Sequence, residues 1–276
     1  MPQNRTQTEP LVPRHRRYPS DTTDGEWKLL QPFVAPDDDG PGAPRTIETR
    51  AVVDALRYRL RTGCQWRQLP RDFPNWKTVY TVFWRWRTSG LWQRIHDALR
   101  RQLRRREGKR SEPTAVILDS QSIRTAEGGE QRGYDAGKKI TGRKRHLAVD
   151  TLGLVWAVVV HSATWQDHEG AHFVLAQLSR QCRRVKVLFA DSAYARQGLP
   201  DWVYATFGWV LQTILRPVAA QGFVVLPKRW IVERTFSWLA RHRRHARDYE
   251  RNTDTSEAMI YIAMISLMSR RLARKR

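Results

Sequence analysis

Hydrophobic residues recur with helical spacing in the first part of the chain. Val52, Leu56 and Leu60 stand four residues apart, which predicts a helix over residues 46–62. Two further helices are predicted by Trp76, Val79, Phe83 and Trp86 on one face and by Ile95, Leu99 and Leu103 on another, with the pattern broken at Gly90.

These helices predict a small all-helical domain over residues 20–110, after a basic, polar segment (1–19) that we expect to be disordered. Three helices with a short break before the last resemble a helix-turn-helix module. Such a module can contact DNA or serve as an interaction bundle. The basic run over 94–110 is compatible with a solvated helix face or with a position along a phosphate backbone.

The pattern changes at Pro113 to short apolar runs that predict buried strands. The runs at 115–123 and 185–194 each contain an aspartate after the apolar residues, and residues 146–163 predict a hairpin. Predicted helices alternate with these strands, so we expect an α/β domain over 113–250. Further strands are predicted at 210–216 and 223–227, further helices at 168–180, in the stretch that starts at Arg229 and over the C-terminal segment 251–276, whose tail is basic.

The net charge of the chain indicates which class of molecule it binds. The 276 residues contain 49 Lys and Arg against 27 Asp and Glu, a net charge of +22, which favours a polyanion, and nucleic acid above all. The two cysteines, Cys64 and Cys182, form no CxxC pair. With no apolar run of transmembrane length and no signal-peptide pattern, we expect a cytoplasmic, nucleoid-associated protein with no membrane partner.

Three carboxylates are the candidate catalytic residues. Asp119 and Asp191 each follow an apolar strand, and strand ends can gather along one edge of an α/β sheet. Glu233 is the one acid in the strongly basic stretch Arg229–Arg244, at the boundary between its apolar and exposed faces. Taken alone, each aspartate could be a turn former and Glu233 could be in a solvated ion pair.

Three carboxylates with no cysteine or histidine cluster favour a hard metal ion. Mg²⁺ or Mn²⁺ prefers oxygen ligands. Two such ions, about 3.5–4 Å apart, can activate a nucleophile and stabilise the leaving oxygen in phosphoryl transfer. We therefore predict a site for two ions on Asp119, Asp191 and Glu233.

Basic residues near these acids are candidate phosphate contacts, because DNA must approach a negative cluster. The stretch GYDAGKKITGRKRH (133–146) combines glycines with basic side chains, and a mobile loop is its simpler interpretation. The candidate DNA-binding residues in this stretch are Lys138, Lys139, Arg143, Lys144 and Arg145.

Several long motifs, in one order, resemble the DDE transposases of the insertion sequence five family. They are RTGCQWRQLPRDFPNWKTVY, LDSQSI, GYDAGKKITGRKRHLAVDTLGL, FADSAY and FVVLPKRWIVERTFSWLARHRR, and the resemblance covers nearly the whole chain. It implies an RNase H-like catalytic domain, with Asp119, Asp191 and Glu233 as the catalytic triad. The implied reaction is cleavage at terminal inverted repeats by metal-activated water, followed by attack of the freed 3′-hydroxyls on target DNA.

Related families carry the signature Tyr-x-x-Arg-x-x-x-Glu-x₆-Lys. Arg229 and Glu233 fit it, whereas Leu226 stands at the tyrosine position and Ala240 at the lysine position, next to Arg241. Arg229 and Arg241 are therefore added to the candidate DNA-binding residues. Transposition brings two DNA ends together, so a dimer on double-stranded DNA is expected.

Two other functions remain open from the sequence. A catalytically inactive or domesticated copy would bind DNA without cutting it, and metal-dependent cleavage would distinguish it. An RNase H-like nuclease with another substrate would cut without joining strands.

Overall fold

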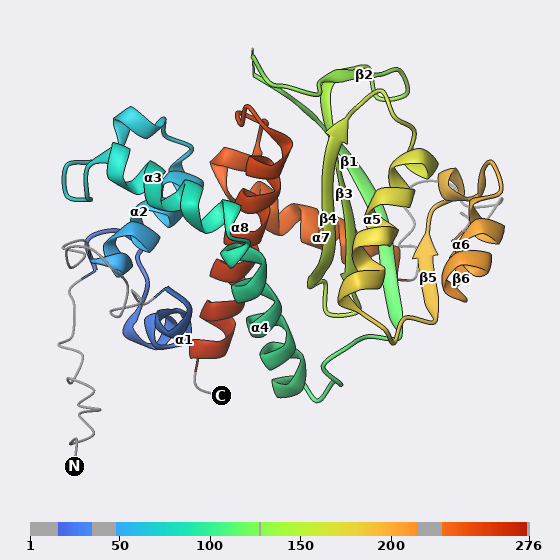
Figure 1. Ribbon diagram of the computed structural model, residues 1–276, viewed down its shortest axis with the longest axis horizontal. Coiled ribbons are helices and arrows are strands. Elements are labelled where there is room, and N and C mark those ends of the chain that lie inside the picture. Colours follow the sequence, from blue (N-terminus) through green and yellow to red (C-terminus); the bar gives the residue numbers. More distant parts are fainter. Residues whose placement is uncertain (1–15, 35–47, 127, 215–227, 275–276) are drawn as a thin grey trace.

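The computed structural model describes residues 16–34, 48–126, 128–214 and 228–274. Its first part is helical, as predicted (Figure 1). The predicted strand at 223–227, residues 1–15 of the segment expected to be disordered (1–19) and the end of the run at 210–216 lie outside the described residues. Residues 16–19 are ordered, contrary to that expectation, because Tyr18 packs against Tyr58 and Phe73. The helical elements are α1 (Asp24–Val34), α2 (Thr49–Thr62), η1 (Trp66–Gln68), α3 (Trp76–Thr88) and α4 (Leu91–Arg106).

A six-stranded mixed sheet forms the second part. Its strands are β1 (Ala115–Arg124), β2 (Gly133–Asp135), β3 (Ile140–Asp150), β4 (Val155–Ser162), β5 (Val187–Ala190) and β6 (Val210–Thr213). β3 pairs antiparallel with β1 on one side and with β4 and the short β2 on the other, while β5 and β6 continue from β1 in parallel. The expected hairpin at 146–163 is confirmed as β3 and β4, which meet at a turn with Gly153 at positive φ.

Helices cover both faces of this sheet. α5 (Asp167–Gln181) and α6 (Leu199–Phe207) pack on one face over Val116, Leu118 and Leu188. α7 (Arg229–Ala240) packs on the other face against β1 and β3. The short helices η2 (Ser192–Ala195) and η3 (Arg243–His245) follow β5 and α7. The period-two alternation of a strand therefore sends successive side chains of β1 into two different cores.

The C-terminal helix α8 (Thr253–Ala273) lies between the helical region and the sheet (Figure 1). It packs on α4, α1 and α2 on one side and on β4 on the other, and its body is almost wholly buried. One hydrophobic core thus runs from α1 through α8 to the α7 face of the sheet. The division into separate domains at residues 110 and 250 stays a prediction.

Candidate active site

Strand register brings two of the predicted acids together. In the parallel pair of β1 and β5, Ile117 is the partner of Phe189. Asp119 and Asp191 each come two residues later, and equal advance along parallel neighbours keeps side chains adjacent. Asp191 directly follows β5, as predicted, whereas Asp119 lies inside β1, which continues to Arg124 paired with β3. The prediction that Asp119 ends its strand is therefore wrong, because the polar half of β1 still has a partner.

Alternation also decides which face the two aspartates occupy. Ile117 and Phe189 belong to the core under α7, and residues two positions further along each strand share that side. The carboxylates thus lie on the face covered by α7, the helix that carries Glu233. This shared face follows from the sequence spacing together with the strand pairing.

α7 is fixed to the sheet by its own polar groups. Ile231, Val232, Phe236 and Leu239 form its buried side. Thr235 Oγ1 donates to the carbonyl of Gly153 at 2.8 Å, and Arg234 Nη2 donates to the carbonyl of Leu152 at 3.1 Å. The β3–β4 turn thus anchors the middle of α7 to the sheet.

Arg229, the first residue of α7, links two of the acids. Its Nη2 lies 3.7 Å from Asp191 Oδ2, and its Nε lies 3.5 Å from Glu233 Oε1, one helical turn away. The Glu233 side chain is 51% exposed, so it lies at the mouth of the site, while that of Asp191 is 22% exposed. The Arg229 guanidinium therefore lies between the Asp191 carboxylate, which follows β5, and the Glu233 carboxylate on α7.

The carboxyl group of Asp119 has a strongly raised pKa. Its pKa is raised to about 7, chiefly by burial and in smaller part by the nearby Asp191, against the opposing effects of the Ser120 amide, Arg229 and Lys138. Ser120 N donates to Asp119 Oδ1 at 2.8 Å, and Ala193 N donates to Asp191 Oδ1 at 2.9 Å. One carboxylate oxygen of each aspartate is thus oriented by a backbone amide. The negative charge of the two aspartates is incompletely neutralised by the groups around them.

The two aspartates fit a divalent cation, because Mg²⁺ and Mn²⁺ prefer carboxylate oxygens as ligands and keep further positions for water and phosphate. Within the described ranges, no three His, Cys, Asp or Glu side chains form a group that could hold a metal ion. Glu233 therefore does not complete a three-carboxylate group in this arrangement, in which it is paired with Arg229.

Three of the five basic candidates at 133–146 are interior. Arg143, Lys144 and Arg145 on β3 are 0%, 6% and 2% exposed. Arg143 bonds Asp248 and the carbonyl of Glu250, Lys144 bonds Asp167, and Arg145 bonds the carbonyl of His245. This corrects the expectation that they contact DNA, because Arg143 and Arg145 hold the C-terminal segment on the sheet and Lys144 is paired with Asp167 and Asp135.

Three other basic candidates face solvent, whereas Arg229 is paired within the site. Lys138 and Lys139 lie exposed in the turn between β2 and β3, and Arg241 is exposed at the end of α7. Lys138 is close enough to Asp119 to lower the pKa of that carboxyl. These residues remain available to a phosphate backbone.

A second polar group includes Ser120, the residue that follows Asp119. Ser120 Oγ donates to Asp167 Oδ1 at 2.6 Å, and Lys144 Nζ donates to the same oxygen at 3.0 Å. Burial opposes ionisation of Asp167, but these two hydrogen bonds outweigh it and lower its pKa. Asp167 does not cap its helix, because Gln166 and Glu169 form the capping box of α5.

Behind this group, the Tyr194 hydroxyl lies 2.5 Å from His146 Nε2, and His146 Nδ1 lies 3.2 Å from His161 Nε2. Burial and the neighbouring His161 lower the pKa of His146 to about 3. Both imidazoles are thus neutral core groups, as expected for histidines without metal-ligand spacing. The only sequence signal of this cluster was the position of Tyr194, three residues after Asp191.

Comparison with known proteins identifies the family. The model described as transposase DDE domain matches residues 110–269, and a model for transposases of the IS4/5 family matches residues 22–96. The first match covers more than half of the chain, which therefore belongs to the DDE transposases, a class of enzymes. The second match and the relatives below identify it as an insertion-sequence transposase of this type. Together with the strand order, the family confirms the predicted RNase H-like α/β fold behind a helical N-terminal region.

Two relatives are shorter proteins. One is the uncharacterized 16.2 kDa protein of insertion element IS402 from Burkholderia cepacia, 30% identical over 115 residues, which are 39% of this chain and 75% of that protein. The other is the uncharacterized protein y4sN of Sinorhizobium fredii, 30% identical over 79 residues, which are 29% of this chain and 62% of that protein.

Among solved structures, the chain is similar to a pre-cleavage Mos1 transpososome at 12% identity and a TM-score of 0.28, over 86% of this chain and 80% of that one. It is also similar to the Mos1 paired-end complex with the left transposon end, at 14% identity and a TM-score of 0.23, over 64% and 61% of the two chains. Similarity at this level does not align individual residues.

None of the helices in the described residues has both the length and the apolar character needed to cross a membrane.

Proposed function

We propose that this transposase cleaves double-stranded DNA at the terminal inverted repeats of its own element and joins the freed 3′-hydroxyls to target DNA. The observation that carries the proposal is the parallel register of β1 and β5, which sets Asp119 beside Asp191 on the face covered by α7. Glu233 lies on that helix, and the Arg229 guanidinium lies between it and Asp191. Family membership supports the reaction class.

Asp119 and Asp191 are the residues that would hold a divalent ion, Mg²⁺ or Mn²⁺, with Glu233 as the third ligand in place of its pair with Arg229. Two such ions, when bound, lower the pKa of water and stabilise the charge that develops on the phosphate and the leaving oxygen. The chain's own part is to orient the aspartates through the amides of Ser120 and Ala193. Released from Glu233, Arg229 can contact the scissile strand.

Exposed basic residues around the site would hold the DNA backbone. Lys138, Lys139 and Arg241 face solvent, and the net charge of +22 gives a long-range attraction to polyanions. Because two ends must be cut and joined together, the acting species is a dimer on DNA. It would work in the cytoplasm, at the nucleoid.

The test is cleavage of an end-labelled duplex that carries the flanking terminal repeat, in Mg²⁺ and in EDTA. Asp119→Asn and Asp191→Asn remove the charges that hold metal, and Asp201→Asn, an exposed acid on α6, is the matched control. We expect Mg²⁺-dependent cutting at the repeat end by wild type and Asp201→Asn, with at least a hundredfold loss, about 2.7 kcal/mol of transition-state stabilisation, in the other two.

Three results would contradict the proposal. Cutting by Asp191→Asn at the wild-type rate would remove the aspartates from the chemistry. Retained DNA binding with no cutting by wild type would favour a binding protein without catalysis. Cutting without subsequent joining of 3′-hydroxyls to a target duplex would favour a nuclease.

A further inference from the structure

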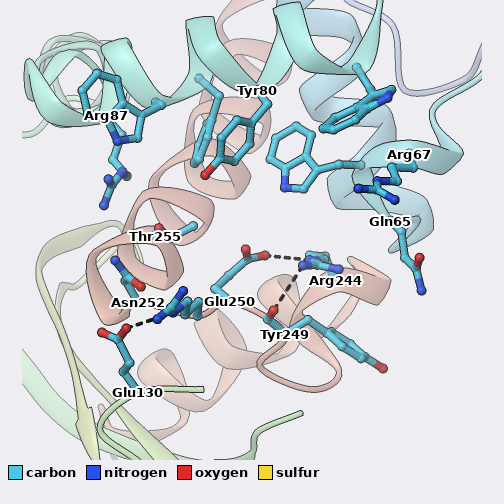
Figure 2. A pocket seen from close by; sticks show the side chains of 15 residues that line it. Gln65, Arg67, Tyr80, Arg87, Glu130, Arg244, Tyr249, Glu250, Asn252 and Thr255 are labelled. Atoms are coloured by element: carbon cyan, nitrogen blue, oxygen red, sulfur yellow. Dashed lines mark hydrogen bonds and ion pairs between the residues drawn. The ribbon is translucent and has the colours of Figure 1, made fainter. Parts of the chain in front are cut away.

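A cavity of about 690 Å³ opens between α3 and the segment that joins α7 to α8. Figure 2 shows Tyr80 and Arg87 on one wall and Arg244 and Tyr249 on the other. The volume is within the range of ordinary ligand sites. None of the three carboxylates of the candidate active site lines it.

One wall is a stripe of aromatic rings. Trp76, Tyr80 and Trp84 recur every fourth residue on α3, so they lie on one side of the helix. The buried residues of α3 are Val79 and Phe83, which leaves Tyr80 44% and Trp84 48% exposed. Large rings grouped on an exposed helix face mark interaction sites more often than they serve stability.

The other wall combines an aromatic ring with guanidiniums. Tyr249 is 46% exposed, and the Arg244 guanidinium lies 5.0 Å from its ring centroid. Arg244 Nε is 2.6 Å from Glu250 Oε1, and Arg59, which bonds the same oxygen at 3.5 Å, lies 3.9 Å from the Trp66 ring. The one carboxylate of this wall is therefore neutralised by two arginines.

This wall is held in place before any ligand arrives. Arg143 Nη1, wholly buried on β3, donates to the carbonyl of Glu250 at 2.9 Å and lies 3.3 Å from Asp248 Oδ2. Asp248 Oδ1 in turn accepts from the amide of Glu250 at 3.0 Å. A wall organised in advance loses little conformational entropy on binding.

The mouth of the cavity carries exposed positive charge. Arg67 is exposed, and Arg251, 80% exposed, is 3.0 Å from Glu130, itself 53% exposed. An ion pair this exposed contributes little to the stability of the fold. A phosphate can therefore replace Glu130 as the partner of Arg251.

We propose that this cavity binds an unpaired nucleobase of a DNA strand, stacked on Trp84 and Tyr80, with the adjoining phosphates at Arg67 and Arg251. Flat exposed rings beside guanidiniums at the mouth are the combination that binds single-stranded nucleic acid. The inference rests on the proposed function, because it takes DNA as the ligand. It adds a second contact, away from the carboxylates, at which a separated strand is held.

The test compares two labelled strands of about 12 nucleotides, within the usual site sizes for single-strand binding. One is oligothymidine and the other has the same phosphates but abasic sugars. Fluorescence anisotropy gives the Kd of each for wild type, Trp84→Ala and Tyr80→Ala, with Tyr204→Ala, an exposed tyrosine on α6, as the matched control. A repeat-containing duplex is titrated in parallel.

We expect wild type and Tyr204→Ala to bind oligothymidine more tightly than the abasic strand by about tenfold, the effect of one base–aromatic stack. Trp84→Ala should lose that preference and leave duplex binding unchanged. Photo-crosslinking from 5-iodouracil should label α3 in wild type.

Equal binding of the two strands by wild type, or equal weakening of both by Trp84→Ala, would overturn the nucleobase site while duplex binding still supports the proposed function. A change in oligomeric state of Trp84→Ala with unchanged base preference would assign the cavity to a protein partner instead. If wild type binds neither strand nor duplex, both proposals fail.

Discussion

Arg229 has a second role at the residue scale. The sequence predicted it as a DNA contact, and the structure places it between Asp191 and Glu233, at 3.7 and 3.5 Å. Its positive charge reduces the repulsion among carboxylates that face one another. In the proposed function, a divalent ion would take over this neutralisation and Arg229 would turn to the DNA.

The buried hydrogen bond between Tyr194 and His146 can be tested for its contribution to the stability of the fold. Its hydroxyl is 2.5 Å from His146 Nε2, and its turn carries Asp191 at the N-cap. Tyr194→Phe leaves His146 without this buried partner and should lower the free energy of unfolding by about 1–3 kcal/mol. Urea denaturation would measure it, with Tyr204→Phe on the exposed face of α6 as control. Equal stability of the two variants would show that the buried hydrogen bond contributes nothing.

Residue roles were only partly predictable from the sequence. Asp191 was placed correctly, because an apolar strand followed by Asp is a local pattern. The burial of Arg143 was not predictable, since its partners Asp248 and Glu250 are more than a hundred residues away. The Ser120–Asp167 hydrogen bond likewise joins two polar residues that no spacing relates.

At the scale of elements, the free edge of β4 is covered by side chains. Val158 N donates to Gln177 Oε1 on α5, and Val160 N donates to Glu257 Oε1 on α8, each at 2.9 Å. A strand whose edge groups are covered this way cannot pair with another chain. The two helices therefore close the sheet at this side.

Glu257 makes stability depend on pH. Its pKa is raised to about 7, chiefly by burial and in smaller part by Asp254, against an opposing effect of the Val160 amide. Because the folded-state pKa lies above the ordinary value of 4.5, the stability it contributes is complete below pH 4.5 and is lost as pH rises to about 7.

Glu257→Gln keeps an acceptor for Val160 and removes this loss. The variant should have a higher free energy of unfolding than wild type at pH 8, by about 1–3 kcal/mol, and the difference should shrink at pH 5. Thermal melts at several pH values would show it, with Asp201→Asn as the exposed control. A difference that does not change with pH would contradict the assignment.

α4 is attached to the sheet by buried arginines. Arg104 Nη1 is 2.5 Å from Asp150 Oδ2, which is wholly buried and also accepts from the Trp156 indole at 3.0 Å. Arg100 lies over the Trp156 ring at 3.6 Å. The basic run of this helix was predicted as a solvated or DNA-facing surface, and part of it instead holds the helical region on β3 and β4.

Removing Arg104 leaves the Asp150 charge buried without its guanidinium. Arg104→Ala should therefore lower the free energy of unfolding by about 3–5 kcal/mol. The adjacent Arg105→Ala, on the exposed side of α4, should change it by less than about 0.5 kcal/mol. Urea denaturation of both variants separates the two predictions, and equal effects would show that the buried ion pair does not anchor the helix.

Element positions were largely predictable, because periodicity of three to four or of two residues is a local property. The helices at 49–62, 76–88 and 91–106 and the hairpin of β3 and β4 fall where the hydrophobic pattern put them. The sequence pattern did not predict that β3 starts at Ile140, since the first half of this strand is basic and resembles a loop. Those basic side chains are buried because carboxylates and carbonyls from distant parts of the chain bond them, from η3 to α8 for Arg143 and Arg145 and from β2 and α5 for Lys144.

At the scale of the whole molecule, one hydrophobic core connects the two proposed sites. The helical region, α8 and the α7 face of the sheet share buried side chains, so a DNA contact on α3 and the carboxylates on β1 belong to the same packed body (Figure 1). The net charge of +22 surrounds this body with a field that attracts DNA, while the acids form a local negative site within it.

The most direct test of this account is Mg²⁺-dependent cleavage of the repeat-end duplex by Glu233→Gln. Glutamine keeps the shape of the side chain and removes the charge that would hold metal beside Asp119 and Asp191. The account predicts that the variant binds the duplex as tightly as wild type and that its cleavage is lost. Cleavage at the wild-type rate would show that Glu233 is only the surface partner of Arg229 and would contradict the assignment of the triad.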